Sequence, residues 1–213
     1  MAIRAIFFDV AHTLLDKPTV LPGMHAVLKE HGIDVPLETL CARHAMLMEA
    51  FDFPDLTDQA FYRGFNAAVV RSLGAVPTPG LLDALFSSST YQPWTAYADV
   101  GALASIPLPK GVLSNWDMSL EDKLAGVPGV DFRWILGSAA SKVRKPDEAF
   151  FKLVLSATGL KAPEIAYVGD SMKLDIEPSS RLGFHAILID RQGLYPHASV
   201  QRVRSLSALE GIL

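Results

Sequence analysis

One short run of residues constrains the fold of this chain more than any other feature. We expect a first strand over residues 3–8, where the run Ala5-Ile6-Phe7-Phe8 has the apolar character of a strand buried on both faces and ends abruptly at Asp9. In an open α/β sheet, ligands bind beyond the carboxyl ends of the strands, which is where Asp9 would lie. A buried carboxylate is unfavourable unless a partner such as a metal ion offsets its charge. The run therefore predicts either a functional carboxylate or the N-cap of a following helix.

The first strand is followed by a long block in which we identify no second strand. Apolar residues recur there at helical spacing, and glycines and prolines separate the periodic segments. Successive amphipathic helices of this kind predict a small helical bundle. The expected helices cover residues 24–31, 37–51, 57–73 (with Thr57 as the N-cap) and 81–89.

Strands and helices alternate in the remainder of the chain, which predicts a parallel sheet with right-handed crossovers. The predicted fold class is therefore α/β, with residues 1–15 and 96–213 in one core domain and residues 16–95 in an inserted helical domain. After residue 95, the expected strands cover residues 111–113, 134–136, 165–168 and 185–189, and the expected helices cover 98–105, 117–125, 148–158 and 170–182.

The composition limits the class of protein. Half of the 213 residues are apolar and a fifth are charged, which suits a globular protein with a sizeable core. The net charge of −4 gives no electrostatic reason to expect binding to nucleic acid or to an anionic membrane. Cys41 is the only cysteine, so no intrachain disulfide can form, which fits the reducing cytoplasm. We expect a cytoplasmic monomer or homodimer that acts on a small molecule.

Polar residues follow further strands in the predicted sheet. Ser114-Asn115 come directly after the second strand, and Gly169-Asp170 come after the fourth. Lys145 lies on a loop that follows the third strand, and it is the one basic residue of that loop that precedes a proline. Each segment alone is typical of a turn or a helix start. Because the carboxyl ends of parallel strands share one edge, we expect all of them to lie near Asp9.

These segments, in this order, resemble the motifs of the haloacid dehalogenase (HAD) superfamily, in the subgroup with a helical cap inserted after the first motif. The resemblance covers both core and cap, and it implies a Rossmann-like parallel sheet core of HAD type with an inserted α-helical cap domain. The matching residues are Asp9, Thr13 and Leu14 in the first motif, Ser114-Asn115 in the second, Lys145-Pro146 in the third, and Gly169-Asp170 with Asp175 in the fourth.

The resemblance implies a hydrolase, most simply a Mg²⁺-dependent phosphatase acting on a small phosphorylated metabolite. Asp9 would be the nucleophile that attacks phosphorus and forms an aspartyl phosphate. Ser114 and Lys145 would hold the phosphoryl oxygens, and Lys145 would also stabilise the transition state. The implied metal ligands are Asp9, the carbonyl of Ala11, Asp170 and Asp175, and the implied substrate contacts are the Asn115 amide, His12, Thr13 and Trp116.

The chain departs from the family pattern directly after the nucleophile. Phosphatases of this family usually carry a second aspartate two residues after the nucleophile, followed by a glycine, where this chain has Ala11 and His12. The missing aspartate is the general acid and base, a contribution typically worth ~10²–10⁴-fold in rate. We therefore expect slower ester hydrolysis with metal binding retained, because position 11 contributes only a carbonyl.

Four interpretations follow from this departure. The first is a slow phosphatase, or one in which the neighbouring His12 replaces the acid. The second is a phosphonoacetaldehyde hydrolase, but that enzyme needs a cap lysine and only Lys17 and Lys29 are available. The third is a metal-independent 2-haloacid dehalogenase, which the retained Asp170 argues against. The fourth is a catalytically weakened binding or regulatory protein, which the retained motif residues disfavour.

Overall fold

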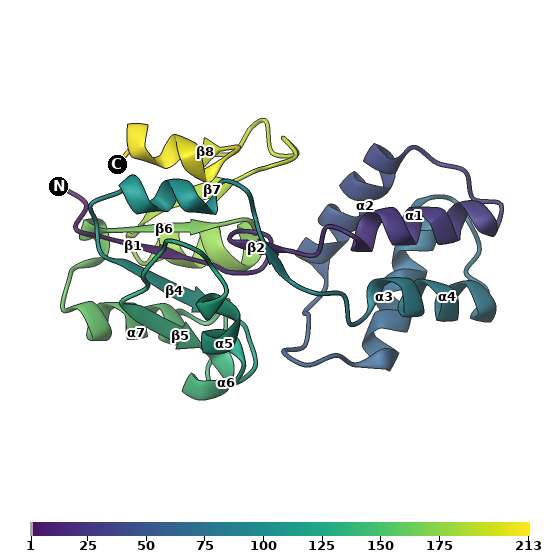
Figure 1. The fold of residues 1–213 in the computed structure, drawn as a ribbon, viewed down its shortest axis with the longest axis horizontal. Helices are drawn as coiled ribbons and strands as arrows, with labels where there is room; N and C mark the ends of the chain where they lie inside the picture. Colours follow the sequence, from purple (N-terminus) through teal and green to yellow (C-terminus); the bar gives the residue numbers. More distant parts are fainter. Residues whose placement is uncertain (1) are drawn as a thin grey trace. The chain divides into compact units, whose positions relative to one another are not determined.

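The structure is a computed structural model that describes residues 2–213. The chain divides into two units: residues up to Asp16 together with Ala96–Leu213 form the first, and Lys17–Thr95 form the second. The first unit contains a parallel sheet flanked by helices, which confirms the α/β fold class (Figure 1). None of the described helices has both the length and the apolar character needed to cross a bilayer.

The first unit is built on a six-stranded sheet in the order β5-β4-β1-β6-β7-β8, in which all neighbouring strands run parallel. Its central strand, β1, is fully buried, as its uninterrupted apolar sequence predicts. β8 was not predicted, because its three residues include polar Gln201 and Arg202 and form no apolar run. The strands are β1 (Ala5–Phe8), β4 (Lys110–Ser114), β5 (Trp134–Gly137), β6 (Ile165–Gly169), β7 (His185–Ile189) and β8 (Gln201–Val203).

The register of the sheet brings the carboxyl ends of β1, β4 and β6 close together, with β4 ending at Ser114 and β6 at Gly169. Phe8 lies opposite Val112 of β4 and Val168 of β6. The backbone N–H of Asp9 extends this ladder by donating to the Val168 carbonyl at 2.9 Å. The residues that follow each of these strands therefore meet at one carboxyl edge.

One face of the sheet is covered by α7 (Glu148–Thr158). Its residues Phe150 and Phe151 pack in one cluster with Phe7 and Tyr167 of the sheet. Figure 1 shows η1 and η4 side by side on the other face. The remaining helices of this unit are α5 (Leu120–Ala125), α6 (Ser138–Ser141), η2 (Ala162–Glu164), η3 (Met172–Ile176) and α8 (Glu177–Arg181), with η1 spanning Val100–Ser105 and η4 Leu206–Gly211.

Two predicted helices of this unit differ in the structure. The helix expected over residues 98–105 is a 3₁₀ helix that begins at Val100. The helix expected over 170–182 consists of a π-helical segment, η3, followed by the short α8. π-helical turns occur often at functional sites, and this one contains Asp175.

The second unit consists of four helices around their own apolar core. Apolar residues at helical spacing on all four helices form one cluster, centred on Leu28, Leu40, Phe65 and Leu85. Phe51 and Phe53 extend this core with edge-to-face contacts to Phe65. The helices are α1 (Val20–Glu30), α2 (Leu37–Ala50), α3 (Gln59–Ser72) and α4 (Pro79–Ser89). Two short strands, β2 (Leu15–Asp16) and β3 (Thr95–Ala96), pair with each other.

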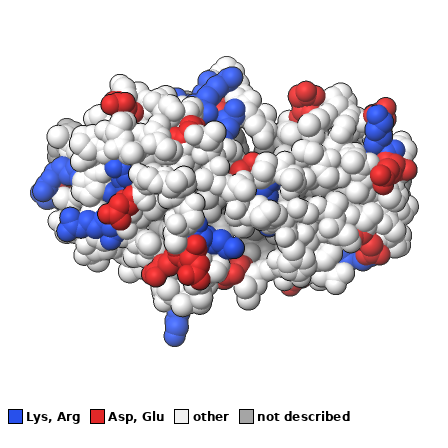
Figure 2. All heavy atoms as spheres, viewed as in Figure 1, with Lys and Arg blue, Asp and Glu red and all other residues white. Residues whose placement is uncertain are grey.

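Lysine, arginine, aspartate and glutamate residues are interspersed over the face drawn in Figure 2. No large continuous patch of one sign is visible on that face. The net charge of −4 is the difference between 19 basic and 23 acidic residues.

The predicted N-cap of α3 is one residue out of place. Asp58 caps this helix, and its carboxylate accepts a hydrogen bond from the Phe61 backbone N–H at 2.8 Å. Thr57, which the sequence suggested, lies one residue too early for this geometry. Adjacent Asp and Thr are both good caps, so only the backbone decides between them.

We predict that Asp58→Ala lowers the free energy of unfolding by about 1 kcal/mol, because the first turn of α3 loses its side-chain acceptor. Thr57→Ala is the matched control, and we expect it to change the free energy by less than about 0.5 kcal/mol. Urea unfolding followed by circular dichroism measures both. Equal effects from the two substitutions would contradict the assignment of Asp58 as the cap.

Candidate active site

Four buried side chains meet at the carboxyl edge of the sheet. Asp9 follows β1 and Ser114 ends β4, and the Ser114 hydroxyl donates to Asp9 Oδ1 at 3.0 Å. Lys145 lies on the loop before α7, and its Nζ donates to the same Oδ1 at 2.5 Å. Nζ also donates to Asp175 Oδ1 at 2.7 Å. The arrangement joins four segments that are far apart in the sequence.

The two oxygens of Asp9 have different surroundings. Both hydrogen bonds, from Ser114 and from Lys145, fall on Oδ1. No donor from residues 2–213 reaches Oδ2. The carboxylate is therefore held by one oxygen while the other is left available for a metal ion or an electrophile.

Lys145 differs from the other two basic residues of its loop because its side chain is buried. Lys142 and Arg144 on the same loop are exposed, whereas Lys145 is only 3% exposed. Burial lowers the pKa of its ammonium group, but the adjacent carboxylates of Asp175 and Asp9 outweigh this effect and raise the pKa. Lys145 is therefore a permanent positive charge inside the site.

The carboxylates of this site outnumber its cations. Asp9, Asp170 and Asp175 each offer one oxygen such that the three oxygens lie within 4.8 Å of one another. Burial raises the pKa of Asp170 to about 8, with the charges of Asp9 and Asp175 adding to the effect. Burial also raises the pKa of Asp175 to about 6, against the opposing charge of Lys145. Full ionisation of this cluster requires more positive charge than Lys145 alone supplies.

The position of Asp175 depends on a glycine. A Cβ atom on Gly169 would overlap the Asp175 carboxyl group, so the last residue of β6 must lack a side chain. On the other side, the Ser171 backbone N–H donates to Asp175 Oδ2 at 3.1 Å. The Gly-Asp-Ser turn and the π-helical segment therefore act together to bring Asp175 back to the edge of the sheet.

Asn115 binds the main chain of Lys145 with both ends of its side-chain amide. Asn115 Nδ2 donates to the Lys145 carbonyl at 3.0 Å, and Asn115 Oδ1 accepts from the Lys145 N–H at 2.8 Å. This pairing fixes the backbone that carries the Lys145 ammonium group. The next residue, Trp116, is largely buried, and its indole N–H donates to Ser119 at 3.3 Å.

The loop after Asp9 contains Ala11 and His12, which depart from the first motif, and Thr13, which matches it. Ala11 presents only its backbone and forms an isolated bridge with Leu15. His12 has a left-handed backbone, with φ of 58°, and its ring lies 3.4 Å from the Asp16 carboxylate. Burial lowers the pKa of His12, but Asp16 and the nearby Asp170 outweigh it and raise the pKa overall. Thr13 is fully buried.

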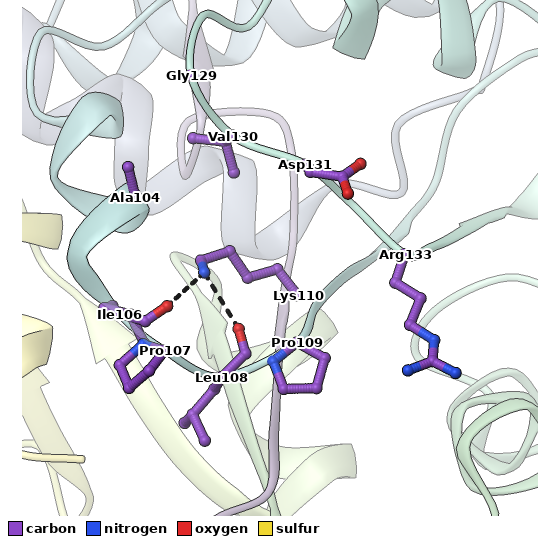
Figure 3. Close-up of a pocket in the computed structure, with 10 residues that line it drawn as sticks. All are labelled: Ala104, Ile106, Pro107, Leu108, Pro109, Lys110, Gly129, Val130, Asp131 and Arg133. Atoms are coloured by element: carbon purple, nitrogen blue, oxygen red, sulfur yellow. Dashed lines mark hydrogen bonds between the residues drawn. The ribbon is translucent and has the colours of Figure 1, made fainter.

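A pocket of about 580 Å³ lies elsewhere in the same unit. It is lined by residues between Ala104 and Lys110 and between Gly129 and Arg133. Figure 3 shows the Lys110 ammonium group in this pocket, bound to the carbonyl oxygens of Ile106 and Leu108. Lys110 begins β4 whereas Ser114 ends it, so the pocket lies at the opposite end of this strand from the carboxylate cluster.

Comparisons with known proteins agree with this geometry. A family model described as HAD-hydrolase-like matches residues 142–206. Haloacid dehalogenase-like hydrolase domain-containing protein 3 of Danio rerio is 30% identical over 146 residues, which is 63% of this chain. The chain is therefore similar to hydrolases of the HAD superfamily. The match covers 60% of the zebrafish protein, so it spans less than two thirds of that relative.

Other HAD superfamily relatives include different kinds of hydrolase. Phosphoglycolate phosphatase of Yersinia pestis is 28% identical over 180 residues, covering 80% of this chain and 74% of that protein. A HAD hydrolase of Bacillus subtilis, solved bound to magnesium, has a TM-score of 0.64 at 17% identity and covers 100% of this chain and 99% of its own. Solved structures that share the fold include both phosphatases and L-2-haloacid dehalogenases.

The donor set of this HAD site fits a hard divalent cation. Carboxylate and carbonyl oxygens are the ligands that Mg²⁺ prefers. Asp9, Asp170 and Asp175 bring three carboxylate oxygens within 4.8 Å of one another, and a divalent cation would offset their charge. Asp9 and Asp170 would hold the cation with the Ala11 carbonyl, and Asp175 would contribute directly or through water.

Tyr167 is a site residue that the sequence analysis missed. Its hydroxyl lies 3.0 Å from Asp175 Oδ1 and 3.1 Å from the Leu113 carbonyl, beneath the cluster. The available signal was a tyrosine within the otherwise aliphatic strand Ile165–Gly169, because a buried phenol needs a hydrogen-bond partner. Its ring packs in the core against Phe151.

We predict that Gly169→Ala weakens Mg²⁺ binding by about 10–100-fold, since the new methyl group would displace Asp175. Gly101→Ala is the control, because a Cβ at that position meets open space. Isothermal titration calorimetry with MgCl₂ measures both affinities. Wild-type affinity in Gly169→Ala would show that Asp175 has no part in metal binding.

Proposed function

We propose that this protein is a Mg²⁺-dependent phosphatase that hydrolyses a small phosphorylated metabolite through an aspartyl phosphate. The observation that carries the proposal is the Asp9 carboxylate, which is held by Ser114 and Lys145 through Oδ1 and has Oδ2 free of hydrogen bonds. A carboxylate fixed by one oxygen is well arranged to attack with the other.

The proposed reaction has two steps. In the first, a carboxylate oxygen of Asp9 forms a bond to phosphorus, and the bond between phosphorus and the leaving oxygen breaks. In the second, water attacks phosphorus, the Asp9–phosphorus bond breaks, and phosphate leaves with the carboxylate restored. Lys145 and Ser114 stabilise charge on the phosphoryl oxygens in both steps.

The acidic cluster supports the metal dependence in this proposal. Bound Mg²⁺ would polarise the phosphoryl group as a Lewis acid and offset its charge. Asp170 has no other assigned role, and its retention argues against a dehalogenase that attacks carbon without metal. The chain's own contribution is to hold the carboxylates and Lys145 in position.

Ala11 sets the limit on turnover. A leaving alkoxide must gain a proton, and the methyl side chain of Ala11 cannot act as the general acid that supplies it. Leaving groups that are stable as anions avoid this requirement. We therefore expect this protein to favour phosphate esters with good leaving groups, such as p-nitrophenyl phosphate or acyl phosphates.

The decisive assay measures phosphate release from p-nitrophenyl phosphate with and without Mg²⁺, beside chloride release from 2-chloropropionate. We expect phosphate release that depends on Mg²⁺ and falls by at least about 10³-fold in Asp9→Asn, which removes the nucleophile. Chloride release without added metal would support a dehalogenase instead. Mg²⁺ binding without either reaction would support a binding or regulatory protein.

Restoring the missing acid gives a second test. We predict that Ala11→Asp raises turnover of an alkyl phosphate such as glycerol phosphate by about 10²–10⁴-fold. The gain with p-nitrophenyl phosphate should be smaller, because that leaving group needs no proton. Ala11→Asn controls for shape without supplying an acid. No gain from Ala11→Asp would mean that another group, with His12 the nearest, already supplies the proton.

We propose a cytoplasmic protein that works as a monomer or homodimer without nucleic acid or membrane partners. The single cysteine and the net charge of −4 support this assignment.

A further inference from the structure

Arg191 makes contacts that the proposed chemistry does not explain. It follows β7 at the carboxyl edge of the sheet, and its side chain is 18% exposed. Its guanidinium group pairs with both oxygens of Asp99, at 2.9 Å and 3.1 Å, in a bidentate arrangement. The group also lies 3.6 Å from the centre of the Tyr97 ring. Such stacked, bidentate contacts are specific to arginine.

The remaining contact of Arg191 reaches the loop that carries the nucleophile. Its Nη2 donates to the Thr13 carbonyl at 2.8 Å. The Tyr97 N–H donates to the next carbonyl, that of Leu14, at 3.0 Å. One guanidinium group therefore links Thr13, which lies shortly before the chain enters the second unit, to Tyr97 and Asp99, which lie shortly after it returns to the first.

The partners of Arg191 are themselves fixed. Asp99 Oδ2 accepts from the Ser205 hydroxyl at 2.8 Å and from the Leu206 N–H at 2.9 Å. Burial raises the pKa of Asp99, but these bonds and the Arg191 charge outweigh it and hold the pKa below its usual value. Within the Thr13 loop, the N–H groups of Leu14 and Leu15 both donate to the Val10 carbonyl.

We propose that Arg191 is a positioning residue for the nucleophile loop, fixing the main chain from Val10 to Leu15 through the Thr13 carbonyl. This loop holds Ala11, whose carbonyl is a ligand in the proposed metal site. Displacing it would misplace both Asp9 and that carbonyl. The kinetic consequence rests on the proposed phosphatase activity, whereas the effect on the loop itself does not.

Peptide-resolved hydrogen exchange of the metal-free full chain tests the effect on the loop. In Arg191→Met we expect the Leu14, Leu15 and Tyr97 amides to exchange about 10-fold faster or more, with β1, β4 and β6 unchanged. Arg202→Met is the control, because Arg202 is also a partly buried arginine that pairs with a carboxylate, that of Asp190, at 2.8 Å. Unchanged loop exchange, or equal acceleration throughout the sheet, would overturn the proposal.

Kinetics with p-nitrophenyl phosphate and Mg²⁺ test the effect on catalysis. We expect Arg191→Met to lower kcat by about 10²-fold at a temperature where it is fully folded, with Arg202→Met close to wild type. Faster loop exchange with wild-type kcat would overturn the positioning role. If the wild type releases no phosphate, the proposed function fails, and hydrogen exchange still decides whether Arg191 holds the loop.

Arg191→Lys keeps the inference testable if Arg191→Met does not fold. Lysine retains the positive charge but cannot pair with both Asp99 oxygens and the Thr13 carbonyl in one plane. We expect faster exchange at the same three amides in a folded protein. Wild-type exchange and wild-type kcat in Arg191→Lys would show that charge alone suffices and would overturn the proposal.

Discussion

The site depends on one buried interaction, the contact of the Lys145 ammonium group with the carboxylates of Asp9 and Asp175. Burying any one of these charges alone would be strongly unfavourable, so each depends on the others. The contact also joins the loop after β1, the loop before α7 and the π-helical segment after β6. The three charges can be buried because the ends of the parallel strands bring them close enough to pair.

The groups around this contact hold Lys145 and Asp175 in position. Asn115 holds the Lys145 backbone, Tyr167 contacts Asp175, and Gly169 leaves the space that Asp175 fills. The site tolerates its excess of carboxylates because this frame is rigid and because its donor set suits a divalent cation. A divalent cation would offset the excess negative charge of these carboxylates, whereas an anionic phosphoryl group would add to it.

The departure at Ala11 separates binding from proton transfer. The residues that the resemblance assigns to phosphoryl and metal binding are all present, and the residue it assigns to proton transfer is absent. Ala11 still offers a carbonyl, so its side chain is not needed for the metal site. In the proposed phosphatase reaction, turnover therefore depends strongly on the leaving group of the substrate.

The sequence by itself determined the α/β class, the inserted helices and the residues at the strand ends, because these follow from local apolar periodicity and from motif spacing. It also identified Asp9 and Lys145, since a charge bordering an apolar strand or preceding a proline is visible locally. Only the tertiary structure decided that Asp58 rather than Thr57 caps α3, that Asp175 lies on a π-helical segment, and that Tyr167 and Arg191 contact the site region. The physical reason is that hydrogen bonds between distant segments depend on strand order and register, which no local pattern encodes.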